Sequence, residues 1–144
     1  MDSLQLQLCD IQGRLFELSG REGYKSESFI KNTMSSPVAE GLDSLYNRYQ
    51  WAGEEYLLEE LTETVPGMKM GTPYPQEVLY WTGYLYRYWQ IEKGIASAKI
   101  VKIAPPAAMK RNYTMFHTMD PLMAIEDLTE LHAQKKSANR NGSC

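Results

Sequence analysis

Apolar residues recur at helical spacing from the start of the chain. In residues 3–19 they step by four, three, four and three positions, which places them on one face of a helix: Leu4, Leu8, Ile11, Leu15 and Leu18. Gly13 lies inside this segment, and Gly20 and Gly23 follow it. The pattern predicts an amphipathic first helix that buries its leucine face.

Capping residues mark the next elements. Ser26 is expected to cap a helix over 27–35, and Ser36 followed by Pro37 is typical of an N-cap and a first helical position. A further helix is predicted over 53–63, with three leucines facing inward and glutamates outside. The glutamates form either a solvated face or a docking surface for a basic partner: Glu54, Glu55, Glu59, Glu60 and Glu63.

Residues 64–75 hold three prolines and two glycines and are the clearest loop, but they are too short for a domain linker. A long helix over 75–94 follows and is predicted to stop at Gly94. Residues 97–103 contain β-branched residues that favour a strand, but a lone strand has nothing to pair with. We therefore predict a short helix there.

Prolines also start the last two predicted helices. Pro105-Pro106 begins a helix that runs to about residue 117, and Asp120-Pro121 is an N-cap signal for a helix over 121–135. Residues 136–144 are predicted to be a flexible polar tail. The fold class is thus all-α: a single domain over 1–135, an irregular bundle of about six to seven helices around a central aromatic helix.

Composition narrows the classes of function. The chain has 144 residues, of which 43% are hydrophobic and 23% charged, as in one globular domain. The net charge of −3 gives no overall attraction for nucleic acid, although a local basic patch is compatible with it. No signal peptide or long apolar run is visible, so we expect a cytoplasmic protein without a membrane partner. Cys9 and Cys144 are expected to be free thiols.

The helix over 75–94 carries six tyrosines and tryptophans within ten residues: Tyr80, Trp81, Tyr84, Tyr86, Tyr88 and Trp89. At 3.6 residues per turn, Trp81, Leu85, Tyr88 and Trp89 lie near one stripe, and we interpret its Trp81, Leu85 and Trp89 side as structural. The adjacent stripe places Tyr80 and Tyr84 beside Arg87. Tyrosine and arginine are enriched in binding hot spots, so a partner-binding site is predicted here: Tyr80, Tyr84, Arg87 and Tyr88.

Gly83 lies in the middle of this aromatic helix. A glycine there costs roughly 1 kcal/mol relative to alanine, which close approach of another helix would justify. Trp51-Ala52-Gly53 also combines small residues with a large ring. We predict it as the complementary contact.

Motifs for metal, nucleotide or nucleophile chemistry are missing from the sequence, and the two histidines, His117 and His132, stand apart. No cofactor or metal site is therefore expected. Asp43 and Asp120 are most simply caps. The sequence thus favours a protein that is not an enzyme.

One short segment does resemble a catalytic motif. Arg111-Asn112 followed by His117 is similar to the motif of HEPN ribonucleases, in which two chains join their arginine and histidine pairs. The resemblance implies a homodimer that cleaves RNA without metal, with Arg111 stabilising charge, His117 as acid and base, and Asn112 as polar partner. Because Asp120-Pro121 follows closely, His117 is alternatively the C-terminal cap of its helix.

A second resemblance covers nearly the whole chain. Its segments run from Ser28-Phe29-Ile30 to Leu42-Asp43, over 50–56, over 80–87 and over 117–120. They are similar to small uncharacterised bacterial proteins from gene cassettes that also hold ADP-ribosyltransferase-like proteins of toxin–antitoxin type. The resemblance implies a genetic context and no catalytic residue.

Two hypotheses follow. The first is a non-enzymatic interaction protein, an antitoxin-like or accessory member of a toxin–antitoxin or defence cassette that binds another protein, such as the neighbouring gene product. The alternative is the HEPN-like ribonuclease, with RNA as its ligand and Arg111, Asn112 and His117 as its catalytic residues.

Overall fold

The computed structural model describes residues 1–44 and 52–142, and for 140–142 the backbone alone. In these residues the chain forms eight helices and no strand. They are α1 (Ser3–Arg21), α2 (Ser26–Met34), α3 (Pro37–Asp43), α4 (Glu54–Thr64), α5 (Gln76–Lys93), α6 (Ser97–Ile103), α7 (Pro106–Phe116) and α8 (Pro121–Gly142). The all-α class is confirmed, although there are eight helices in the described residues instead of the expected six to seven. Residues 97–103 form the short helix that the sequence predicted.

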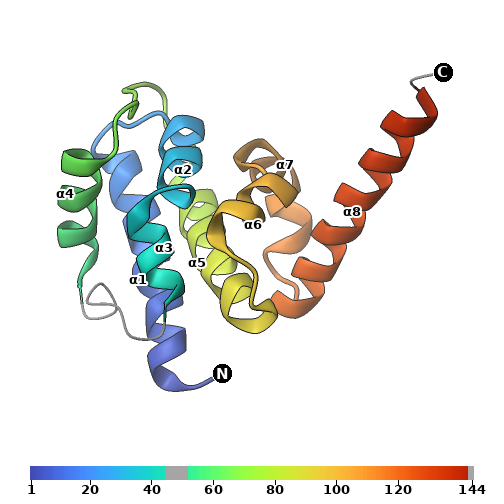
Figure 1. Cartoon of the computed structure of the whole chain (residues 1–144), viewed down its shortest axis with the longest axis horizontal. Helices are drawn as coiled ribbons and strands as arrows, with labels where there is room; N and C mark the ends of the chain where they lie inside the picture. Colours follow the sequence, from blue (N-terminus) through green and yellow to red (C-terminus); the bar gives the residue numbers. More distant parts are fainter. Residues whose placement is uncertain (45–51, 143–144) are drawn as a thin grey trace.

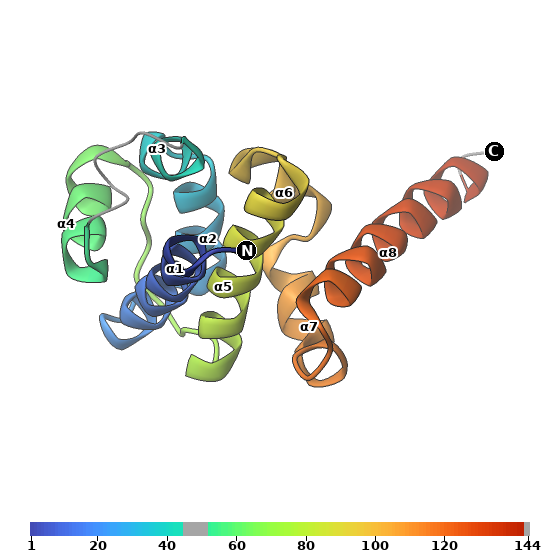
Figure 2. The same cartoon turned by 90° about the horizontal axis from the view of Figure 1, so that it is seen from below.

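The aromatic helix α5 is the central element. It lies between α1 on one side and α6, α7 and α8 on the other, while α4 covers the outer side of α1 (Figures 1 and 2). The most extensive interface in the described chain joins α1 to α5. The other helices therefore pack around this pair.

Two glycines allow α1 and α5 to approach so closely. A Cβ atom on Gly83 would lie 2.5 Å from the carbonyl oxygen of Gln12, and one on Gly13 would lie 2.8 Å from the ring of Tyr80. Gly83 thus meets another helix, as predicted, but its counterpart is Gln12-Gly13. Gly53, proposed as that counterpart, would find only Glu55 within 4 Å, and Trp51 lies outside the described residues.

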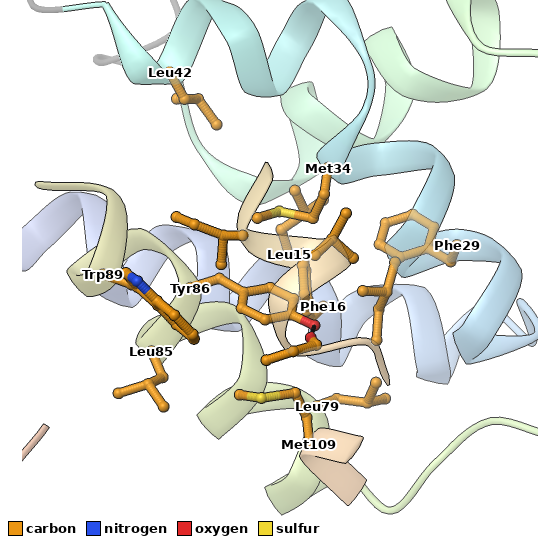
Figure 3. Packing of buried hydrophobic residues seen from close by; sticks show 14 of the residues in the cluster. Leu15, Phe16, Phe29, Met34, Leu42, Leu79, Leu85, Tyr86, Trp89 and Met109 are labelled. Atoms are coloured by element: carbon orange, nitrogen blue, oxygen red, sulfur yellow. Dashed lines mark hydrogen bonds between the residues drawn. The ribbon is translucent and has the colours of Figure 1, made fainter. Parts of the chain in front are cut away.

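The core forms where α1, α2 and α5 meet (Figure 3). The ring of Phe16 packs edge-on against Phe29 at 5.9 Å and against Tyr86 at 6.2 Å between centroids. Tyr86 is fully buried, and its hydroxyl donates to the carbonyl of Ala104 at 2.5 Å. This bond satisfies the one polar group that the ring brings into the core and joins α5 to the end of α6.

The stripe interpreted as structural is largely buried. Leu85 and Trp89 are each 1% exposed. Trp81 is half-buried and packs against the core, with its ring edge-on to Tyr113 of α7 at 5.7 Å. This side of α5 therefore faces neighbouring helices, as predicted.

Three of the predicted helix boundaries are confirmed by their caps. The Ser36 hydroxyl accepts from the Ala39 N–H at 3.2 Å, and Asp120 accepts from the Leu122 N–H at 2.9 Å. Gly94 ends α5 in the left-handed conformation, with φ of 64°.

Ser26 does not cap α2, contrary to prediction. Lys25 occupies the cap position, and Ser26 is the first helical residue. The buried Ser26 hydroxyl instead accepts from the Tyr74 N–H at 2.8 Å. Nearby, the Lys25 N–H donates to the Lys69 carbonyl at 2.8 Å. The start of α2 thus holds the long loop between α4 and α5.

Helix α8 continues to Gly142, whereas the sequence predicted an end at 135 and a polar tail from 136. No proline or glycine interrupts 122–141, and its alanine, glutamine and lysine residues favour a helix. Ala124, Ile125 and Leu128 are buried against the body. Beyond them α8 projects away from the other helices (Figures 1 and 2), and in 129–139 every residue except His132 is exposed.

Candidate functional site

Arg87 of α5, predicted for the partner-binding surface, is fully buried, and its partners come from α1 and α3. Its Nε and Nη2 atoms donate to the side-chain oxygen of Gln12 at 3.0 and 2.7 Å. Its Nη1 atom donates to a carboxylate oxygen of Asp43 at 2.5 Å. The guanidinium therefore has all its partners inside the protein, and its inclusion in an exposed site was wrong.

Asp43 joins this buried cluster from the C-terminal end of α3. Besides Arg87 it accepts two hydrogen bonds from Ser97, the N–H at 2.9 Å and the hydroxyl at 2.6 Å. Asp43 thus caps the start of α6 across the fold. The cluster ties four helices together, α1, α3, α5 and α6, and its role is structural.

Burial also shifts the pKa values of two titratable groups at this place, Arg87 and Cys9. Desolvation lowers the pKa of Arg87, and the carboxylate of Asp43 acts in the opposite direction. Desolvation raises the pKa of the free thiol of Cys9, which is fully buried, to about 12. The Cys9 thiol is therefore protonated and unreactive near neutral pH. Cys144 lies outside the described residues.

The three tyrosines of the predicted site remain at the surface and form a row along α5, which we call the tyrosine ladder: Tyr80, Tyr84 and Tyr88. Each is partly exposed. Ring centroids are 6.0 Å apart between Tyr80 and Tyr84, and 6.3 Å apart between Tyr84 and Tyr88, where the rings are stacked. Spacing of four residues on a helix places the rings above one another. The ladder is a continuous aromatic strip on a rigid helix.

Carboxylates flank both ends of the tyrosine ladder. The Tyr80 hydroxyl donates to Asp10 of α1 at 2.5 Å, and Asp10 also pairs with Arg14 at 3.0 Å. At the other end, the pKa of Tyr88 is raised mainly by burial. The negative charges of Glu92 and Asp120 raise it further. The hydroxyls are therefore protonated at neutral pH, and the strip has an acidic border.

The three residues that resemble a ribonuclease motif lie on α7 and at its C-terminal end. Arg111 is exposed and lines a groove toward α8, and the Asn112 amide donates to the Ala108 carbonyl of its own helix at 2.9 Å. His117 follows Arg111 by six positions, roughly 120° away around the helix axis. Its Nδ1 atom lies 2.7 Å from the Tyr113 carbonyl, and its ring stacks on that of Tyr113 at 4.2 Å. His117 is thus the predicted C-terminal cap of α7.

Among residues 1–44 and 52–142, no group of three His, Cys, Asp or Glu side chains could hold a metal ion. Within the same ranges, no helix is long and apolar enough to cross a membrane.

Comparison of the chain with models of protein families, with curated proteins and with solved structures found no match.

Proposed function

We propose that this chain is a non-enzymatic protein-interaction module that binds another protein through the tyrosine ladder. One observation carries the proposal: Tyr80, Tyr84 and Tyr88 form an aromatic strip that stays partly exposed, whereas Tyr86 and Trp89 of the same helix are buried. Tyrosine supplies a large contact area with a polar tip at low entropic cost, which suits a binding surface.

The surroundings of the ladder define the partner's chemistry. With Arg87 buried, the charged groups that act on the ladder include the carboxylate of Asp10, which is paired with Arg14, and those of Glu92 and Asp120, which raise the pKa of Tyr88. A partner that places arginine or lysine over these rings would gain both cation–π attraction and opposite charge. The expected partner surface is therefore basic. An exposed Arg87 would instead have required an acidic partner surface.

The resemblance to proteins of toxin–antitoxin-like cassettes supports a context for this activity. In that context the chain is a cytoplasmic antitoxin-like or accessory protein, and its partner is the neighbouring gene product. Within the described residues, the place of Arg111 in the groove toward α8 and the capping role of His117 favour binding over the alternative of RNA cleavage.

Co-expression with the neighbouring gene product tests this proposal. The wild-type chain should co-purify with that protein, and Tyr84→Ser combined with Tyr88→Ser should abolish co-purification. Tyr56→Ser is the matched control, because Tyr56 is 47% exposed on α4, away from the ladder. Equal co-purification of all three chains, or none with the wild type, would contradict the proposal.

A further inference from the structure

A groove of about 490 Å³ runs between α6, α7 and the projecting part of α8. This volume lies within the usual range of binding pockets. Its walls come from the end of α6, one face of α7 and three turns of α8. The residues that define its character are Lys102, Ile103, Arg111, Leu131, Lys135 and Lys136.

The charge of this groove opposes that of the whole chain. Four of its lining residues are lysine or arginine, and all four are exposed: Lys102, Arg111, Lys135 and Lys136. His132 also lines it, and no Asp or Glu of the described part of the chain does. In a protein of net charge −3, such a cluster produces a local positive potential that attracts an anionic partner.

Below these charges the groove is apolar. Leu128 is 2% exposed and continues the core into the groove, whereas Leu131, one turn further along α8, is 41% exposed. Ile103, Pro105 and Ala108 line the opposite wall and are partly exposed. An apolar floor between basic edges complements an amphipathic ligand that has an apolar stripe and acidic flanks.

A ligand in the groove would also stabilise the projecting part of α8. Short helices are marginal in water, and most helices are stabilised by burying an apolar face against a neighbour. In residues 129–139 of α8 the three apolar side chains, Leu131, Ala133 and Ala138, are all exposed. A segment lying in the groove would cover Leu131 and bridge α7 to α8.

We propose that the groove binds an acidic amphipathic helix of a partner protein, at a site separate from the tyrosine ladder. The α8 wall spans Leu128 to Asn139, which corresponds to about three helical turns, so the bound segment has a similar length. Its leucine-like side chains would contact Leu131 and Ile103, and its carboxylates would pair with Arg111, Lys135 and Lys136.

A nucleic acid is the competing occupant of a basic groove. Proteins that bind single strands stack bases on aromatic rings, and duplex binding relies on phosphate contacts along an extended surface. Among the described residues that line the groove there is no Phe, Tyr or Trp, His132 supplies the one aromatic ring, and half of the lining is apolar. The observations therefore favour a polypeptide.

Fluorescence anisotropy with the full chain tests the proposal. The probe is a labelled peptide of about 14 residues, with leucines at helical spacing and glutamates elsewhere. Companion probes replace its glutamates by lysines, replace its leucines by serines, or are a single-stranded RNA of similar length. We expect binding only by the acidic leucine peptide, weakened at least about tenfold by Lys135→Glu with Lys136→Glu and by raised salt.

Lys93→Glu with Lys99→Glu is the control, since it changes the net charge equally at exposed positions outside the groove. Circular dichroism of both double variants checks that the fold is kept, and Leu131→Ser should weaken binding without any change of charge. The proposal is overturned if the acidic peptide does not bind below about 100 μM. It is also overturned if both double variants bind the acidic peptide with equal affinity. The same holds if the RNA binds the wild-type chain and Lys135→Glu with Lys136→Glu abolishes that binding.

Discussion

Gly83 of α5 lies directly against the main chain of Gln12 in α1, and the Gln12 amide donates to the Gly83 carbonyl at 2.9 Å. The same Gln12 side chain accepts two hydrogen bonds from Arg87, one turn further along α5. Close backbone approach and buried polar contacts thus occur at one crossing point. The stability of the whole fold depends on this crossing, because α1 and α5 share the largest interface of the described chain.

Gly83→Ala should destabilise the protein by at least about 2 kcal/mol, although alanine is the better helix former by roughly 1 kcal/mol. The added Cβ would lie 2.5 Å from the Gln12 carbonyl oxygen, so the two helices must separate. Urea unfolding followed by circular dichroism measures the change. Gly53→Ala is the control, because only Glu55 lies within 4 Å of its added Cβ, and we expect a loss below about 1 kcal/mol. Equal effects would contradict the crossing.

Arg87→Ala should cost about 3–5 kcal/mol of unfolding free energy, because it leaves Asp43 and Gln12 without their buried partner. Adding Asp43→Asn to that variant should recover part of the loss, since no unpaired charge then remains. Arg14→Ala removes an ion pair whose side chains are 57% and 35% exposed, and should cost less than about 1 kcal/mol. A small effect of Arg87→Ala would show that the cluster does not hold the helices together.

Cys9 should make stability depend on pH in the alkaline range. Its pKa rises from 9.0 to about 12 on folding, so its stabilising contribution is complete below pH 9 and is lost as the pH rises toward 12. In a Cys144→Ser background, the unfolding free energy should fall between about pH 8 and pH 10.5 by about 1–2 kcal/mol more than in the same background with Cys9→Ala. Parallel pH profiles would show that the thiol is not buried.

The local elements of this fold could be predicted from the sequence, and the polar cluster could not. Leucine spacing, Ser36-Pro37, Asp120-Pro121 and Gly94 each act within a few residues, so helices and their ends follow from neighbouring positions. The end of α8 was missed because a polar surface composition is compatible with either a helix or a tail.

In the candidate site, too, features set by neighbouring residues could be predicted and features set by distant residues could not. That Tyr80 and Tyr84 lie side by side could be predicted from their spacing within α5, but Tyr88, which was placed in the neighbouring stripe, stacks on Tyr84 as well. The burial of Arg87 depends on Gln12 and Asp43, which are 75 and 44 residues away in the sequence. Nothing local distinguishes such an arginine from an exposed one. The counterpart of Gly83 was missed for the same reason.

RNA cleavage should be undetectable. His117 is held at the Tyr113 carbonyl and stacked on its ring, while Arg111 lines the groove toward α8, so we expect no catalytic pair of these two side chains. Purified protein incubated with labelled RNA in EDTA should leave the substrate intact, as should the His117→Ala and Arg111→Ala variants. Cleavage by the wild type that both variants lose would establish the ribonuclease alternative.

The most direct test of the proposed function is hydroxyl-radical footprinting of the complex with the neighbouring gene product, read by mass spectrometry. Each tyrosine then reports its own change in exposure. We predict that oxidation of Tyr84 and Tyr88 falls when the complex forms, while oxidation of Tyr56 on α4 is unchanged. Protection of Tyr56 with unchanged oxidation of Tyr84 and Tyr88 would contradict the assignment of the tyrosine ladder as the binding surface.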